Sequence, residues 1–258
     1  MQQRSELRFP KPGKATAGLM ISIGVIWLLF AIGINWVGAG ADVFSYLAGD
    51  TRAVLGGQIW RLVSANLITA FKSPGHPLMV CLLLYFFATP MEELWGSRRL
   101  LMFLLGSGAM AFSVQVLVDL LIPQLAVNTW YGGMCMAEAC AVAWAFANRK
   151  QTVYLFFVLP IKPMWMVGFL VAWAILNNII AANPDPEGTI APLASFVVGW
   201  LLCDVGPLRR LYLKVKLRRL QSEVSSLTRR RQRSSRRKNG PDLRVIKGGN
   251  DDDPKMLH

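Results

Sequence analysis

Apolar residues along the chain are gathered in six long runs separated by polar segments. The runs cover residues 17–38, 77–91, 100–122, 129–147, 163–182 and 189–204. Several of them extend for about 20 residues with almost no charge, the length of a helix that crosses a bilayer core of about 30 Å. A soluble protein with a large core would show polar helix faces between these runs, and such faces are missing. The pattern therefore predicts an all-α membrane protein with six transmembrane helices, although the second and sixth runs are short for a span.

The long segment between the first two runs, residues 39–76, is also rich in apolar and small residues. It contains LGGQIWRLVSANLITAF, whose one charged residue is Arg61. The neighbouring Trp60 and Arg61 suit the depth of lipid headgroups, because Trp is amphipathic and Arg can extend its charge into water. We expect a partly helical first loop that lies in the membrane interface.

Composition agrees with a membrane protein, since 53% of the 258 residues are hydrophobic, against about 45–50% apolar residues in soluble domains. The net charge of +13 is concentrated near the C-terminus. Residues 209–238 hold thirteen lysines and arginines and one acidic residue, Glu223, so this stretch alone carries +12. The rest of the chain is therefore nearly neutral.

The charges between the apolar runs predict an orientation. Basic residues occur before the first run, in the second and fourth connections and after the last run: Arg4, Arg8, Lys11, Lys14, Arg98, Arg99, Arg149, Lys150, Lys162 and the C-terminal cluster. With six spans, all of these lie on one side, and the positive-inside rule makes that side the cytoplasm. The first run is too long for a cleaved signal peptide, so we expect it to remain as a span.

The chain is predicted to have four parts. Residues 1–16 form a cytoplasmic N-terminal segment and 17–205 the membrane domain, while 206–228 form a basic amphipathic helix and 229–258 a disordered tail. In the basic helix, apolar residues follow spacings of 4, 3, 4 and 3, an a/d pattern of about two heptads: Leu213, Leu217, Leu220, Val224 and Leu227.

The basic helix is predicted to bind anionic lipid of the inner leaflet, through Arg209, Arg210, Lys214, Arg218 and Arg219. Pairing with a partner helix is the alternative, although two heptads are short for a stable coiled coil. Nucleic acid is a less favoured partner, because no aromatic residues are interleaved with the basic ones.

Cysteine spacing predicts neither a metal site nor a cofactor. Cys81, Cys135, Cys140 and Cys203 all lie in apolar segments, and none has metal-ligand spacing with a histidine. We expect packed thiols that act as small hydrophobic side chains.

Five segments in order carry a resemblance to a known family. They are GQIWRLVSANLITA, GHPLMVCLLLYFFATPMEELWGSRRLLMFLLGSG, WYGGMCMAEACAVAWAF, VYLFFVLPIKPMW and IAPLASFVVG. With these segments the chain resembles the rhomboid family of intramembrane serine proteases over roughly residues 50–220. The resemblance implies a rhomboid-like bundle of six transmembrane helices.

The resemblance also implies where catalytic residues should stand. In that family a histidine takes a proton from the attacking serine, and an asparagine and a second histidine hold the oxyanion. The serine position falls on Gly132, the base on Pro192 and the asparagine on Val80, while His76 is retained. Three of the four positions therefore have no side chain suited to this chemistry.

These positions predict a catalytically inactive, pseudoprotease member that binds transmembrane segments or subunits of a membrane complex. The resemblance further suggests a multi-pass protein of a bacterial inner membrane. One alternative is an active protease with a displaced nucleophile, for which Cys135 and Cys140 are the candidates. The other is a structural membrane subunit anchored through the basic tail.

Candidate sites for client binding are Glu138, Trp60 and Arg61. Glu138 lies within an apolar run, where an ionisable residue is costly and suggests function; the alternative is a protonated carboxyl bonded to Asn177, Asn178 or a backbone carbonyl. Glu92 is expected to anchor backbone donors or Arg98. The fourth span has small residues four positions apart at Gly133 and Ala137, and the sixth has them at Ser195 and Gly199. Small residues at this spacing let helices approach closely in lipid, so we expect these two spans to pack together.

Overall fold

A computed structural model describes residues 11–150, 153–155, 159–180, 186–204 and 206–238. The chain divides into two compact units, Met1–Arg210 and Leu211–His258. The first unit holds the predicted membrane domain, and the second holds most of the basic tail. Each is described by itself.

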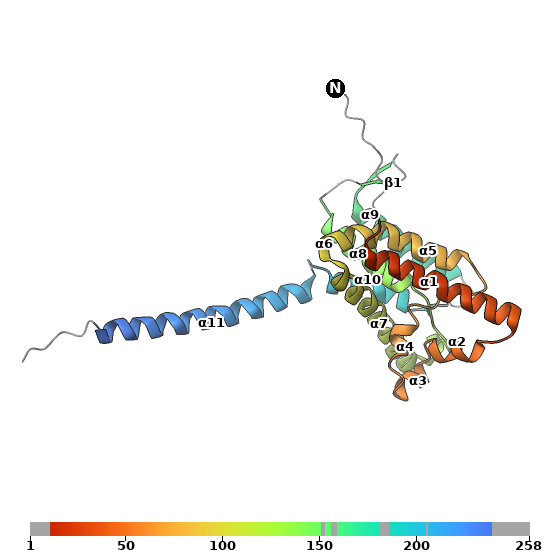
Figure 1. The fold of residues 1–258 in the computed structure, drawn as a ribbon, viewed down its shortest axis with the longest axis horizontal. Helices are drawn as coiled ribbons and strands as arrows, with labels where there is room; N and C mark the ends of the chain where they lie inside the picture. The colour runs from red at the N-terminus through yellow and green to blue at the C-terminus, as the bar shows by residue number, and fades with distance from the viewer. Residues whose placement is uncertain (1–10, 151–152, 156–158, 181–185, 205, 239–258) are drawn as a thin grey trace, which may run out of the picture. The chain divides into compact units, whose positions relative to one another are not determined.

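Each predicted apolar run contains a helix (Figure 1). These helices are α1 (Lys14–Ile32, continued by a π-helical segment, Gly33–Val37), α5 (Gly75–Leu83), α7 (Ser97–Leu121), α8 (Met134–Ala147), α9 (Pro163–Ile180) and α10 (Ala191–Leu202). A π-helical segment, Leu84–Ala88, connects α5 to α6 (Thr89–Trp95), so the second span is longer than its apolar run. A single 3₁₀ turn, Pro123–Leu125, follows α7.

Among the residues that the structure describes, four helical segments are long and apolar enough to cross a membrane, namely Lys14–Val37, Gly75–Trp95, Ser97–Leu121 and Ala191–Gln221. Two others, Met134–Ala147 and Pro163–Ile179, are apolar but shorter. The predicted all-α membrane bundle is thus confirmed. A short antiparallel hairpin, β1 (Val153–Leu155) with β2 (Leu159–Ile161), was not predicted and connects α8 to α9.

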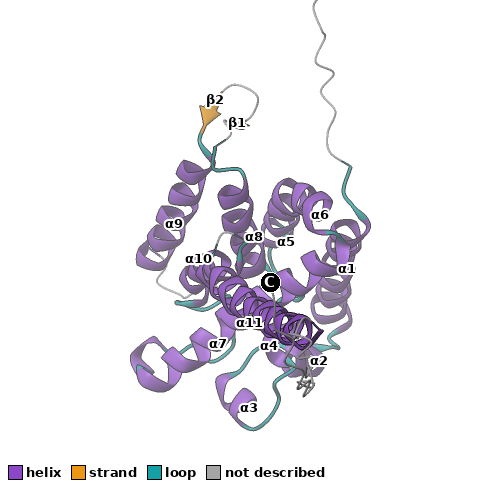
Figure 2. Ribbon diagram, turned by 90° about the vertical axis from the view of Figure 1, so that its left-hand side faces the viewer, coloured by secondary structure: helices purple, strands orange, loops and turns teal. Residues whose placement is uncertain are grey.

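The shorter helix α8 is the most enclosed helix of the bundle, with packing partners that include α5, α7, α9 and α10 (Figure 2). Most of its residues are buried, and they include four fully buried alanines and cysteines in its first two turns: Cys135, Ala137, Ala139 and Cys140. A helix that is apolar on all sides is suited to such a central position. The small side chains allow its neighbours to approach closely.

The closest approach between α8 and α10 occurs at Gly199. A Cβ atom there would lie 2.7 Å from the carbonyl oxygen of Ala139, so a glycine is required for this contact. The predicted packing of the two helices is confirmed, but the facing residue on α8 differs. Gly133 precedes α8, and a Cβ there would meet Val80 and the Asn66 carbonyl, while Ala137 belongs to the core cluster that contains Val80.

The first loop is partly helical, as predicted, with α2 (Ala41–Leu47), α3 (Thr51–Leu55) and α4 (Arg61–Ser64). These helices gather at the end of the membrane domain opposite α6 and the hairpin (Figures 1 and 2). Trp60 is 41% exposed, whereas Arg61 is only 7% exposed. The guanidinium of Arg61 donates to the carbonyl oxygens of Ser45 and Ala48 at 2.5 and 2.6 Å, so the expectation that it extends into water is wrong.

Glu92 on α6 connects the second span to the start of the first. Its carboxylate accepts hydrogen bonds from the backbone N–H groups of Ala15 and Thr16, each at 2.9 Å, and from the hydroxyls of Thr16 and Ser97. The carboxylate therefore satisfies free amides at the N-terminus of α1, where negative charge is also favoured. The prediction that Glu92 anchors backbone donors is confirmed.

The basic helix α11 (Pro207–Lys238) begins in the first unit and ends within the second. It extends past the predicted boundary at residue 228. The predicted disorder of the remaining tail concerns residues 239–258, which lie outside the described residues.

Candidate functional site

Two loops meet at the N-terminus of α8. The first is the Tyr131–Gly133 segment directly before α8, and the second is the segment 186–190 before α10, called here the Glu187 loop. The N–H of Tyr131 donates to the carbonyl oxygen of Pro186 at 2.6 Å, and the N–H of Gly132 donates to that of Ala65 at 2.9 Å. These bonds hold the Glu187 loop and the end of α4 against the start of α8.

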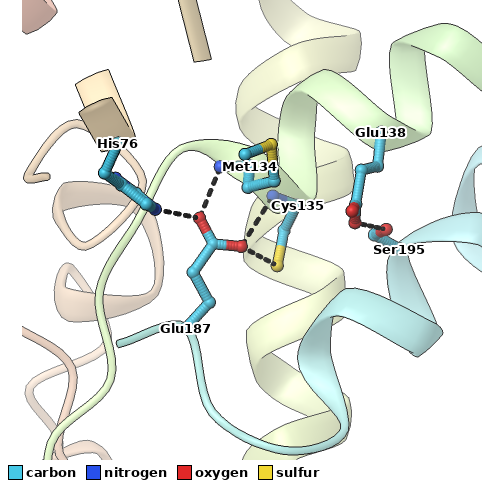
Figure 3. A network of polar contacts seen from close by, with 6 residues as sticks. All are labelled: His76, Met134, Cys135, Glu138, Glu187 and Ser195. Carbon is cyan, nitrogen blue, oxygen red and sulfur yellow. Dashed lines mark hydrogen bonds and ion pairs between the residues drawn. The ribbon is translucent and has the colours of Figure 1, made fainter. Parts of the chain in front are cut away.

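The side chain of Glu187 caps α8 (Figure 3). One carboxylate oxygen accepts from the N–H of Met134 at 2.5 Å, and the other accepts from the N–H of Cys135 at 3.1 Å. Met134 and Cys135 are the first residues of α8, whose opening amides have no partner within the helix. The carboxylate, on a residue only 2% exposed, thus satisfies these amides and complements the helix dipole.

Gly132 provides the space for this carboxylate. A Cβ atom at this position would collide with the Glu187 side chain. The residue also has φ = +148°, a conformation that side-chain-bearing residues rarely adopt. Any larger residue at position 132 would therefore have to displace Glu187.

Cys135 and His76 lie on two sides of the same carboxylate (Figure 3). The Cys135 thiol donates to Glu187 Oε2 at 3.1 Å, and His76 Nε2 lies 3.5 Å from Glu187 Oε1. For His76 to activate the thiol, the imidazole would have to contact the sulfur directly. Here Glu187 stands between them and occupies the position that a base would need to reach the thiol.

A second polar contact joins α8 to α10. The hydroxyl of Ser195 lies 2.9 Å from Oε2 of Glu138 and 2.6 Å from the carbonyl oxygen of Pro192. Ser195 is fully buried and Glu138 is 6% exposed. The hydrogen-bond partner of Glu138 on α10 is thus a serine. Of the two asparagines expected to bond it, Asn178 donates its amide to the carbonyl oxygen of Ala174.

The N-terminus of α10 has its own cap, supplied by Gln115 of α7. The amide oxygen of Gln115 accepts from the N–H groups of Ile190 and Ala191 at 2.8 and 3.0 Å. Its amide nitrogen donates to Asp119 at 2.7 Å. Buried side chains distant in sequence therefore cap both helices: Glu187 caps α8, and Gln115 caps α10.

The described part of the chain contains no group of three or more His, Cys, Asp or Glu side chains arranged to hold a metal ion.

In a comparison with known protein families, the model of the Rhomboid domain matches residues 56–206, which is more than half of the chain. The chain belongs to the rhomboid family. A comparison with curated proteins found no match.

The rhomboid match covers each position at which the resemblance implied catalysis. Val80 is fully buried on α5, and its side chain would lie 3.0 Å from a Cβ at Gly133. Pro192 occupies the first turn of α10, where the missing N–H removes no intrahelical bond. Gly132, Val80 and His76 thus lie close to the start of α8.

Sequence reasoning missed Glu187 as a site residue of this rhomboid protein. The residue lies in a polar loop, PDPEGT, and nothing in that segment indicates a buried carboxylate. Glu187 contacts Met134 and Cys135, which lie 53 and 52 positions earlier in the chain. The spacing of apolar residues along a sequence does not reveal contacts between such distant positions. Of the client-binding candidates, Glu138 and Arg61 are buried, while Trp60 is accessible.

Proposed function

We propose that this rhomboid family member binds transmembrane segments, or subunits of a membrane complex, without cleaving them. The observation that carries the proposal is the Glu187 carboxylate on the amides of Met134 and Cys135. The proposal includes a bacterial inner membrane and cytoplasmic termini. The basic α6–α7 turn, with Arg98 and Arg99, lies opposite the end that holds α2 to α4 (Figure 1), as this orientation requires.

Peptide hydrolysis of the serine type requires a hydroxyl, a base and donors that are free to receive an oxyanion. Gly132 and Pro192 supply neither the hydroxyl nor the base. The backbone donors at the start of α8 already hold the negative charge of Glu187. A developing oxyanion would have to displace this carboxylate, so the arrangement supports binding better than catalysis.

Exposed apolar helix faces offer surfaces for a client helix. On α9, Trp165, Phe169 and Trp173 are 73%, 66% and 54% exposed and follow one face at a spacing of four. On α5, Leu78 is 67% exposed, and Phe86 in the following π-helical segment is 53% exposed. Within a bilayer these faces contact lipid unless another helix replaces it, and helix association there depends on close packing and polar contacts.

One observation favours a second candidate, a cysteine-dependent protease. Cys135 lies at a helix N-terminus, a position that favours a thiolate, and the carboxylate that it contacts also contacts His76. Against this candidate, Cys135 is fully buried and its thiol donates to the carboxylate of Glu187 rather than to a base. We therefore rank it second.

The deciding experiment is a cleavage assay in liposomes with the full-length protein, a reporter transmembrane helix and an active rhomboid protease as positive control. A fluorophosphonate and a thiol-directed probe are applied in parallel. We expect neither cleavage nor labelling by the fluorophosphonate. Cleavage that disappears in Cys135→Ala would establish the second candidate, and cleavage that persists in Cys135→Ala would also overturn the non-catalytic proposal.

Binding is tested by a photo-crosslinking residue at position 165 on α9 or 78 on α5. The matched control is position 102 on α7, where Met102 is 61% exposed. We expect crosslinks to the same transmembrane protein from α5 and α9 and a much lower yield from α7. Equal yields from all three positions would contradict a specific client surface.

A further inference from the structure

Asp204 joins the end of α10 to the start of α11. Its carboxylate accepts a hydrogen bond from the indole N–H of Trp95 at 2.7 Å and forms ion pairs with Arg99 and Arg209. The guanidinium of Arg99 also lies over the Trp95 ring, 4.7 Å from its centroid. The first turn of α11 is therefore held beside the α6–α7 turn, at one end of the membrane bundle.

Within the second unit, α11 presents an apolar row along one side. The leucine row consists of Leu213, Leu217, Leu220 and Val224, which are 45%, 56%, 48% and 61% exposed. The spacings of 4, 3 and 4 place these side chains on one face of a helix. Cations occupy other sides of the same turns: Lys214, Lys216, Arg218 and Arg219.

The charge of α11 decides between two occupants of the leucine row. A second copy of the helix, paired through the row, would bring two stretches of like charge together. Residues 209–238 carry thirteen basic residues and one acidic residue, which leaves +12 on each helix. An anionic leaflet offers an apolar boundary for the row and negative headgroups for the cations.

We propose that α11 lies on the anionic membrane leaflet at the end of α10. The leucine row enters the boundary between headgroups and acyl chains, and the flanking lysines and arginines bind anionic headgroups. Asp204 fixes the point from which the helix leaves the bundle. This inference is independent of whether the membrane domain cleaves or only binds its clients.

The test uses the full-length protein, one copy per lipid nanodisc, with phosphatidylcholine alone or with added phosphatidylglycerol. An environment-sensitive dye is attached at Leu220→Cys in the leucine row or, as matched control, at Arg218→Cys, both in a Cys81→Ala background. We expect a shift to shorter emission wavelength at position 220 in the anionic discs and a smaller shift at 218. Tryptic cleavage within 209–238 is expected to slow by about tenfold in the same discs.

Neutralising the cations with Lys214→Gln, Lys216→Gln and Arg219→Gln is expected to abolish the dye shift and the protection from trypsin. These substitutions lie outside the membrane bundle, so the bundle serves as an internal folding control. Equal dye shifts with and without anionic lipid would overturn the proposal, as would the absence of a shift in both. If the change in dye emission appears only in discs that hold two copies of the protein, the leucine row binds a second copy, and the lipid proposal is overturned.

Discussion

The carboxyl group of Glu138 lies 2.9 Å from the hydroxyl oxygen of Ser195 and joins α8 to α10 inside the membrane domain. The same hydroxyl lies 2.6 Å from the carbonyl oxygen of Pro192. A serine hydroxyl has one proton to donate. The hydroxyl lies within hydrogen-bond distance of both acceptors, and it therefore ties the buried Glu138 side chain to the first turn of α10.

The contact between Glu138 and Ser195 predicts that Glu138→Gln is tolerated, because the glutamine amide can keep a hydrogen bond to the Ser195 hydroxyl. Glu138→Leu should lower the free energy of unfolding by about 1 kcal/mol, since a buried interhelical hydrogen bond is lost. Thermal unfolding in mild detergent measures both variants. An equal loss of stability in Glu138→Gln and Glu138→Leu would contradict a stabilising role for this hydrogen bond.

Removing the cap of α8 should loosen the site. In Glu187→Ala, the amides of Met134 and Cys135 lose their acceptor, and we expect a destabilisation of about 2 kcal/mol. The Cys135 thiol should also react faster with a maleimide in a Cys81→Ala background. The matched control is Glu93→Ala, which removes an exposed carboxylate; an unchanged reaction rate in Glu187→Ala would contradict the capping role.

The glycine contact between α8 and α10 predicts a steric effect. Gly199→Ala would place a Cβ 2.7 Å from the Ala139 carbonyl oxygen, so the helices must separate. We expect a loss of about 1–3 kcal/mol in the free energy of unfolding, which is typical of overpacking. Gly106→Ala on α7 is the control, because a Cβ there meets no atom within 4 Å. Similar stability of the two variants would refute the close approach.

Restoring the implied catalytic residues should not restore proteolysis. In Gly132→Ser with Pro192→His, the new serine Cβ would collide with Glu187 and would need an unfavourable backbone conformation at φ = +148°. We expect a less stable protein that a fluorophosphonate does not label. Labelling of the double variant, absent from each single variant, would show that the site can still assemble for catalysis.

The helices were predictable because the apolar runs exceed the length that a soluble core requires, as in residues 17–38 and 100–122. The Glu92 anchor was predictable in part, because the resemblance to the rhomboid family left backbone donors or Arg98 as its partners, and the structure shows the backbone donors. The caps by Glu187 and Gln115 were not predictable, since each joins segments at least 52 positions apart. Arg61 was misjudged for a similar reason, because its acceptors are backbone carbonyls, which every sequence contains.

The Glu187 loop is tied down along its whole described length. Pro186 accepts from Tyr131, Glu187 accepts from the start of α8, and Ile190 donates to Gln115. A segment restrained at three successive points cannot swing aside without breaking several buried hydrogen bonds at once. Exposure of the start of α8 therefore requires this whole segment to move, because rotation of the Glu187 side chain alone leaves the other two tethers in place.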